Sequence, residues 1–203
     1  DGGKTWLEED LVVAEQPGGW TFDIPGINRC NGLPVTVCDI SDGPDRGTIY
    51  VNWSDQRNGK DDTDIWVSKS TDGGESWSKP LKVNNDNSQR HQFLTWMTVD
   101  QTTGYIYCVY YDRRDHEDNH TDVYLAFSVD GGKAFYDVKI SESPFLPSKK
   151  LFFGDYTNIA AHAGRIWPIW TRKHDQKSSV WTVKIKQTDL ILDEVPPMEE
   201  GGK

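Results

Sequence analysis

Ser70-Thr71-Asp72-Gly73-Gly74-Glu75-Ser76-Trp77 has a pattern that recurs along the chain, and this recurrence is the strongest indication of the fold. Ser128-Val129-Asp130-Gly131-Gly132-Lys133-Ala134-Phe135 repeats the order Ser-x-Asp-x-Gly-x-x-aromatic. A third copy, Asp1-Gly2-Gly3-Lys4-Thr5-Trp6, lacks only the serine. A short motif that returns at such intervals indicates a repeat architecture.

The motif has the chemistry of a turn that is fastened to its neighbours. An Asp side chain can accept hydrogen bonds from backbone N–H groups a few residues on, and glycine adopts backbone angles that other residues resist. The terminal aromatic can fill a gap beside the next sheet. We therefore expect a folding device and not a catalytic one, carried by Asp1, Asp72, Gly74, Trp77, Asp130, Gly132 and Phe135.

The segments between the motif copies predict short strands, four to a unit. They are 33–40, 48–53, 64–70 and 79–83 in the first unit, 93–99, 105–111, 122–128 and 136–140 in the second, and 158–162, 165–170 and 179–185 in the third. The fourth strand of the third unit is either 189–195 or 7–15.

This pattern predicts an all-β fold, a β-propeller built of four-stranded antiparallel blades. About three blades are present in residues 1–195, fewer than the four to eight of closed propellers. We expect them to be the C-terminal part of a larger propeller, with 17–31 as a connection. A tail at 196–203, rich in Pro, Glu and Gly, is predicted to be disordered.

Composition narrows the classes of partner. The net charge of −10 and pI near 4.9 argue against a nucleic-acid binder. No apolar run is long enough to cross a membrane. Three cysteines leave two readings open: a Cys30–Cys38 disulfide, or Cys38 and Cys108 as small core residues.

The motif resembles the Asp-box, or BNR repeat, of the sialidase superfamily. The stretches 153–159 and 165–171 also look like the last blades of bacterial proteins of this kind. The resemblance implies a six-bladed ring, a central site with three arginines that grip a carboxylate, a Tyr nucleophile with an acidic partner, and a secreted or cell-surface location. Asp-boxes also occur in proteins with other activities, so the motif indicates the fold more than the function.

One string departs from the family pattern. Sialidases carry Phe/Tyr-Arg-Ile-Pro around the first of these arginines, whereas this chain has Phe22-Asp23-Ile24-Pro25, with the opposite charge. Three explanations stay open: the string is a coincidence, the true motif lies upstream of residue 1, or the protein is not a sialidase.

Topology nominates the site, because antiparallel strands reverse direction at every turn. The motif hairpins join third and fourth strands at one end of each blade, so loops between second and third strands, and blade-entry segments, lie at the other end. The entry segments also carry Arg29, Asn31 and His91. The candidates for substrate binding at that end are Arg57, Arg113, Arg114, Arg172, Arg90 and Trp96, and for catalysis Tyr156 with Asp155 as its base.

Each candidate has a plainer alternative. The arginines can brace their own acidic loops, while Asp155 can bond to backbone and Tyr156 can pack between blades. The acidic stretches 61–64 and 115–118 offer the oxygen ligands that Ca²⁺ takes, or are simply solvated. No other cofactor or metal is expected.

These observations lead to a glycoside hydrolase of the exo-sialidase class, or a fragment of one, with a glycan as its ligand. The alternatives are a non-catalytic propeller module that binds glycan or protein, and a structural module of a larger surface protein. We expect the chain alone to be inactive, because three blades cannot complete a site that six share. A homodimer that closes a six-bladed ring is a further expectation.

Overall fold

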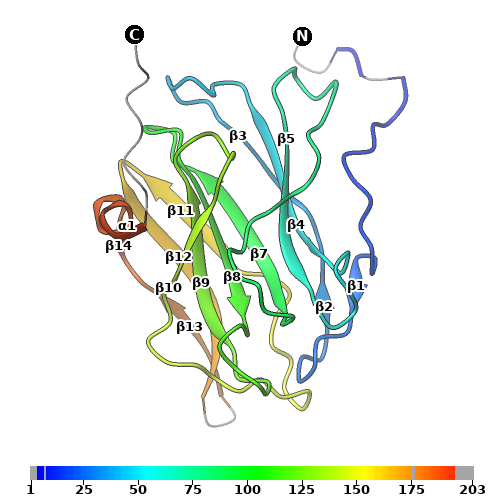
Figure 1. Ribbon diagram of the computed structural model, residues 1–203, viewed down its shortest axis with the longest axis vertical. Helices are drawn as coiled ribbons and strands as arrows, with labels where there is room; N and C mark the ends of the chain where they lie inside the picture. Colours follow the sequence, from blue (N-terminus) through cyan, green and yellow to red (C-terminus); the bar gives the residue numbers. More distant parts are fainter. Residues whose placement is uncertain (1–3, 7, 175–176, 195–203) are drawn as a thin grey trace.

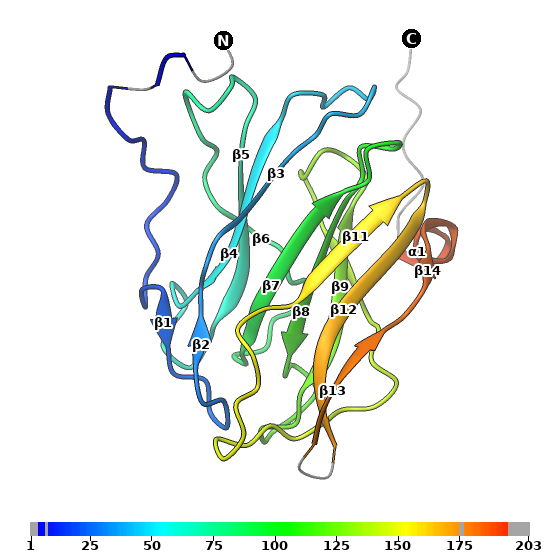
Figure 2. The same cartoon turned by 180° about the vertical axis from the view of Figure 1, so that it is seen from behind.

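The computed structural model describes residues 4–6, 8–174 and 177–194, which form three antiparallel sheets set like a fan (Figures 1 and 2). The first sheet contains β3 (Val35–Cys38), β4 (Ile49–Asp55), β5 (Asp64–Ser70) and β6 (Leu81–Lys82). The second contains β7 (Gln92–Val99), β8 (Ile106–Asp112), β9 (Asp122–Ser128) and β10 (Tyr136–Lys139). The third contains β11 (Asn158–His162), β12 (Arg165–His174), β13 (Lys177–Thr182) and β14 (Ile185–Lys186).

The predicted architecture of three four-stranded antiparallel blades is confirmed. In the first two sheets the strands pair in chain order, and in the third both β13 and β14 pair with β12. The first strands β3 and β11 both contact β7, so the blades meet along their first strands (Figure 2).

The prediction of a fourth strand for the third blade is wrong at both places. Residues 187–194 form the helix α1 (Gln187–Glu194), and residues 8–15 form no strand. Asp189 lies in the first helical turn, where the helix dipole favours an acid. Leu190 of α1 is buried in the main core. The helix therefore covers the third sheet at the place where the sequence predicted a strand over residues 189–195. Residues 7, 195 and 196–203 lie outside the described residues.

The connection 17–31 has structure of its own. It forms a small hairpin of β1 (Thr21–Phe22) and β2 (Cys30–Asn31). Phe22 and Ile24 are buried in the core, whereas Asp23 is exposed and pairs with Lys149 at 3.1 Å. The Phe-Asp-Ile-Pro string is therefore a packing pattern, with alternate residues facing inward.

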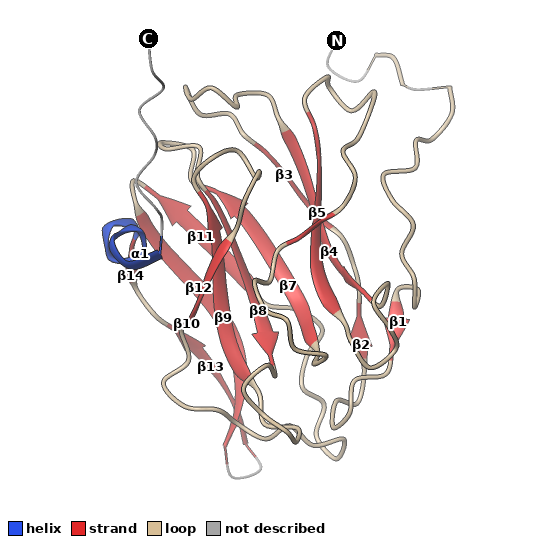
Figure 3. Cartoon of the chain, viewed as in Figure 1, coloured by secondary structure: helices blue, strands red, loops and turns tan. Residues whose placement is uncertain are grey.

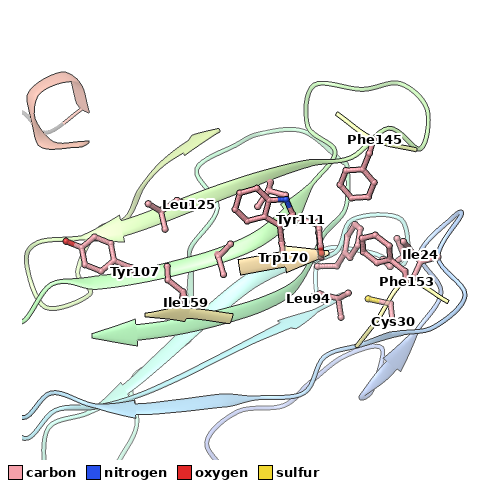
Figure 4. Packing of buried hydrophobic residues seen from close by; sticks show 14 of the residues in the cluster. Ile24, Cys30, Leu94, Tyr107, Tyr111, Leu125, Phe145, Phe153, Ile159 and Trp170 are labelled. Carbon is pink, nitrogen blue, oxygen red and sulfur yellow. The ribbon is translucent and has the colours of Figure 1, made fainter. Parts of the chain in front are cut away.

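The second sheet is sealed on both faces. Every residue of β8 and β9 is buried. One apolar cluster lies between the first and second sheets and includes Tyr50, Met97 and Phe135. A larger cluster joins the second sheet to the third, the β1–β2 hairpin and α1 (Figure 4). These two clusters hold the sheets at their angle to one another.

The three cysteines are free thiols, so the disulfide reading is wrong. Cys30 and Cys108 are buried, as small core residues. Cys38 is exposed, which corrects its expected place in the core. It lies at the end of β3, where half-buried and exposed residues alternate and Cys38 falls on an exposed position.

The turn motif forms the expected network. The Oδ1 atom of Asp130 accepts hydrogen bonds from Ser128 Oγ at 2.8 Å and from the N–H groups of Lys133 and Ala134 at 2.9 and 3.1 Å. The N–H of Gly132 donates to Ser128 Oγ at 2.9 Å. Phe135 at the end of this copy is 8% exposed and packs into the cluster between the first and second sheets.

The copy at 70–77 repeats this network. Ser70 Oγ donates to Asp72 Oδ1 at 2.7 Å and accepts from Gly74 N–H at 2.8 Å. Hydrogen bonds from Ser76 lower the pKa of Asp72 well below its usual range. Trp77 is half-buried, so this aromatic fills its gap less completely than Phe135 does. Asp1 lies outside the described residues.

Gly132 occupies a position that a larger residue could not. Its φ is 73°, in the left-handed region, and a Cβ there would lie 3.3 Å from both Tyr50 and Ile106 side chains. The hairpin therefore approaches the first sheet closely, and it lies at the end of the fan opposite the loops 56–63, 113–121 and 146–157 (Figure 3). This separation of the two ends matches the topological expectation.

We predict that Asp130→Ala lowers the free energy of unfolding by about 1–3 kcal/mol, because three donors lose their acceptor. Chemical denaturation followed by tryptophan fluorescence measures the effect. Asp42→Ala is the control, since this carboxylate is fully solvated and pairs only with Arg46 at 3.4 Å, so a change within about 0.5 kcal/mol is expected. Equal losses in the two variants would show that the turn network does not brace the blade.

Candidate functional site

A pocket with a volume of about 240 Å³ lies where the first strands of the three blades begin, at the end away from the motif hairpins. It has apolar walls and a few polar groups, the usual composition of a small-molecule site. Its lining residues are Asn31, Leu33, Pro34, Val35, Ser54, Leu94, Thr95, Trp96, Asp155 and Tyr156. Of the candidates from sequence, Trp96, Asp155 and Tyr156 meet here.

A β-bulge in β7 shapes one wall of the pocket. The pairing of β7 with β8 shifts between Phe93 and Trp96, and Leu94 in between has a φ of 53°, a strained conformation for a residue with a side chain. The hydroxyl of Thr157 donates to the Leu94 carbonyl at 2.9 Å and fixes the bulge to the strand entry of the third blade. Bulges often redirect a side chain beside a functional site.

Two aromatic side chains border the pocket. The rings of Trp96 and Tyr156 have centroids 6.1 Å apart and an interplanar angle of 54°. Trp96 is half-buried, and Tyr156 is 68% exposed. Tyr156 also lines a neighbouring pocket of about 330 Å³ with Ile169 and Val180 on the open face of the third sheet. The ring of Tyr156 therefore stands between two adjoining hollows.

Asp155 is held by an arginine and not by its neighbour Tyr156. Arg29 Nε donates to Asp155 Oδ1 at 2.8 Å, and Arg29 Nη2 forms a close ion pair with Oδ2. This bond raises the pKa of Arg29 above its ordinary value. Asn31 Nδ2 donates to the backbone carbonyl of Asp155 at 2.9 Å, so the β1–β2 hairpin positions this acid at the pocket. The pairing differs from the expected one, in which Asp155 serves Tyr156 as a base.

Arg57 and Arg114 brace their own blades and do not line the pocket. Arg57 Nε donates to Asp55 Oδ1 at 2.9 Å, and its guanidinium lies 4.3 Å from the ring centroid of Trp66. Asp55 is fully buried. The buried acid would be costly without a positive partner, which gives this arginine a structural role.

The second blade repeats the arrangement. Arg114 bonds to Asp112 and Asp137 at 2.6 and 2.7 Å and lies 4.2 Å from the ring centroid of Tyr124. Burial disfavours the charge of Arg114, but hydrogen bonds from it to both acids outweigh burial and raise its pKa above the ordinary value. The alternative of loop bracing therefore describes Arg57 and Arg114.

The remaining arginines also lie outside the pocket lining. Arg172 donates to Ser143 Oγ and stacks over Trp181, with 4.7 Å to the ring centroid. Arg113 is 1% exposed, and Arg90 is half-buried. These loops therefore do not bring arginines from all three blades together around one anion, as the sequence had led us to expect. The physical reason is that nearer groups of the protein engage each guanidinium first. Acids engage Arg57 and Arg114, aromatic rings engage Arg113 and Arg172, and a backbone carbonyl engages Arg90.

His91 is neither an exposed loop residue nor a pocket residue. It is 6% exposed, and its Nδ1 lies 3.0 Å from Thr63 Oγ1. Burial, and then the positive charge of Arg113, lower the pKa of His91 to about 4. The imidazole is therefore neutral near pH 7 and is not poised as an acid there.

The acidic loops have partners within the protein. Asp64 accepts from Asn58 and Asn84, and Asp115 accepts from the Tyr124 hydroxyl at 2.8 Å. Asp118 bonds to His120. Within the described ranges, no group of three or more His, Cys, Asp or Glu side chains is arranged to hold a metal ion. The helix α1 is too short and too polar to cross a membrane.

We predict that Arg114→Met lowers the free energy of unfolding by about 3–5 kcal/mol, because it strands the buried carboxylates of Asp112 and Asp137. Arg172→Met is the matched control. It removes no ion pair within the described residues, so its cost should stay below about 1 kcal/mol. Urea denaturation of the two variants measures both values, and similar stabilities would contradict the bracing role of Arg114.

Sequence reasoning missed most of the pocket walls. Leu33, Pro34, Val35, Leu94 and Thr95 were expected only as strand or connecting residues. The signal that could have found Leu94 is small, since a strained backbone angle leaves no mark on the residue type. Asn31 and Arg29 were recognised as blade-entry residues, but their bonds to Asp155 depend on a hairpin that the sequence did not predict.

No protein-family model and no curated protein matches this sequence. The fold is similar to that of an α-L-arabinanase from Penicillium chrysogenum, with a TM-score of 0.58 and 14% identity over 87% of this chain and 50% of that one. A family 117 glycoside hydrolase from Zobellia galactanivorans (TM-score 0.47, 14% identity, 84% and 56% covered) is less similar. The NanB sialidase from Streptococcus pneumoniae gives a TM-score of 0.45, with 11% identity and 91% and 48% covered.

The chain spans about half the length of these three proteins. At such low identity the likeness establishes the fold alone. That fold is the β-propeller of glycoside hydrolases, of which the present three sheets make about half.

Proposed function

We propose that this chain is part of a propeller glycoside hydrolase and that its pocket binds a sugar ring against the aromatic wall formed by Trp96 and Tyr156. The observation that carries the proposal is the meeting of two aromatic rings, apolar walls and a bidentate Arg–Asp pair at the start of the first strands. The first strands of the three described blades converge at this end. A ligand in the pocket therefore touches all three of these blades.

The pocket suits the two-sided chemistry of a sugar. The C–H groups of a pyranose or furanose ring are apolar and pack on an aromatic face, as other apolar groups do. The hydroxyls need donors and acceptors, which Asn31, Ser54 and Asp155 offer among the lining residues. Because Tyr156 borders two adjoining hollows, a ligand of more than one ring fits better than a monosaccharide.

The structural likeness supports the same class of ligand. The similar arabinanase was solved with arabinobiose bound, which is a carbohydrate of two rings. The likeness to the arabinanase does not determine which sugar this chain binds. Carbohydrate binding by this chain is part of the proposal. A secreted or cell-surface location and the ring closed by a second copy stay predictions.

We predict that Trp96→Ala and Tyr156→Ala each weaken carbohydrate binding by about tenfold, since each removes a stacking face worth about 1–1.5 kcal/mol. Tryptophan fluorescence or calorimetry with arabino-oligosaccharides, neutral galacto-oligosaccharides and sialyllactose measures the affinities. Trp6→Ala is the control because Trp6 is 85% exposed and does not line the pocket. Unchanged affinity in both pocket variants would exclude this site.

A second candidate is hydrolysis of the sialidase class, with Tyr156 as nucleophile. One observation favours it: Tyr156 is 68% exposed and lines the same pocket as the acid Asp155. The same pocket holds a single carboxylate, Asp155, whereas most glycosidases use two acids. A further acid would have to come from blades beyond these three.

Hydrolysis of a fluorogenic sialoside tests this second candidate. If Tyr156 is the nucleophile, any activity of the protein should fall by at least 100-fold in Tyr156→Phe while sugar binding persists, because only the hydroxyl is lost. Activity that survives in Tyr156→Phe removes the nucleophile assignment. Binding without activity in the unaltered protein leaves carbohydrate binding as the function of this part of the ring.

A further inference from the structure

Arg113 is the largest side chain that the fold buries completely, and it has no acidic partner among the described residues. It is 1% exposed and lies in the loop between β8 and β9. Its Nε donates to Thr121 Oγ1 at 3.1 Å and its Nη1 to Asn119 Oδ1 at 3.3 Å, both neutral acceptors. Its Nη2 is buried with no hydrogen-bond partner. The guanidinium also lies over Phe93, 5.2 Å from the ring centroid.

Arg90 approaches the same loop from the segment before β7. Its Nη2 donates to the backbone carbonyl of Asp118 at 2.8 Å, one residue from the Asn119 that Arg113 contacts. The Nε of Arg90 is also buried without a partner. The N–H of Arg113 donates to the carbonyl of His91 at 3.2 Å, which ties the two segments together. Two guanidinium groups thus converge, each with one unused buried donor.

The local charge is positive, and the charge of Asp118 acts on Arg113 without forming an ion pair with it. No carboxylate forms an ion pair with Arg90 or Arg113 in the part of the chain that the structure describes. Burial and the charge of Arg90 lower the pKa of Arg113 to about 10. His91 adds no charge near pH 7 because its pKa is about 4. A buried charge with unmet donors is costly unless something pairs with it.

The β1–β2 hairpin closes over this place. A Cβ on Gly26 would lie 3.2 Å from Asn119 Nδ2, so the hairpin loop reaches the residue that Arg113 contacts. Ile24, Ile27 and Phe93 belong to the same buried cluster. The two unused donors are sealed from solvent, so we expect only a small ion to fit beside them.

We propose that a chloride-sized inorganic anion binds between Arg90 Nε and Arg113 Nη2, beneath the loop of the β1–β2 hairpin. One negative charge satisfies both unused donors and offsets the repulsion of the two guanidinium groups. The anion then fastens the hairpin loop to the second blade. Because the hairpin carries Arg29 and Asn31, it also steadies Asp155 at the carbohydrate pocket, although the anion site does not depend on what that pocket binds.

The test is thermal unfolding in sodium chloride against sodium gluconate at equal ionic strength. Gluconate is too large for the site, so only chloride should stabilise, with a saturable rise in Tm of about 2–4 °C. Arg113→Met and Arg90→Met should each abolish the chloride-specific rise. Arg46→Met should keep it, since Arg46 is an exposed arginine that pairs with Asp42.

Two results of the thermal experiment would overturn the proposal. One is equal Tm in the two salts, and the other is a chloride-specific rise that persists in both Arg90→Met and Arg113→Met. If Arg113→Met does not fold, Arg90→Met decides alone, because Arg90 is only half-buried. Crystals soaked in bromide give an independent readout: an anomalous peak between the two guanidinium groups supports the site, and a water molecule there overturns it.

Discussion

The reversal of chain direction at every turn is the constraint on which the rest of this structure depends. With four antiparallel strands per blade, the turns after the third strands always fall at one end, and the loops after the second strands always fall at the other. The motif hairpins take the first end, where Asp and Gly residues fasten them. The second end is left free for side chains that do not serve the turns, and the pocket lies there.

The same blades show how buried charge is managed. In two of them an aspartate at the end of the second strand is sealed from solvent and met by an arginine two residues later, which also stacks on an aromatic of the third strand. Such a pair adds little to the net free energy of folding, but removing one of its partners is strongly destabilising. The arginines that look like an anion clamp in the sequence are thereby committed to the framework. Arg113 and Arg90 are the exceptions within the described residues, and their unused donors are what suggests a bound anion.

How far the sequence could predict this fold depends on the range of the interactions involved. The turn motif and the strands next to it are local, so the chain 64–77 and its repeat at 122–135 were predicted closely. The helix α1 was mistaken for a strand, since Leu190 and its neighbours are apolar in a short run that either element could carry. The β1–β2 hairpin was missed because its strands have two residues each and exist through contacts with distant loops.

The candidate site shows the same difference between local features, which the sequence predicts, and long-range contacts, which it does not. Topology alone assigns Trp96, Asp155 and Tyr156 to the same end of the blades, because chain reversal fixes the end at which each lies, and all three line one pocket. Their partners could not be predicted, since the Arg29–Asp155 pair joins residues 126 positions apart. Arg57 and Arg114 were named as ligand residues, with bracing of their own acidic loops as the alternative. The sequence could not decide between the two, because nothing local shows that an acid two residues before an arginine will be fully buried.

The central claim is that ligand chemistry belongs to the end of the blades opposite the motif hairpins. Amide chemical-shift mapping of the isotope-labelled protein, titrated with the oligosaccharide it binds best, tests that claim most directly. We expect the largest shifts on Asn31, Thr95, Trp96 and Tyr156, whereas the resonances of Gly74 and Gly132 should not move. Shifts centred on Gly74 and Gly132 would contradict that claim.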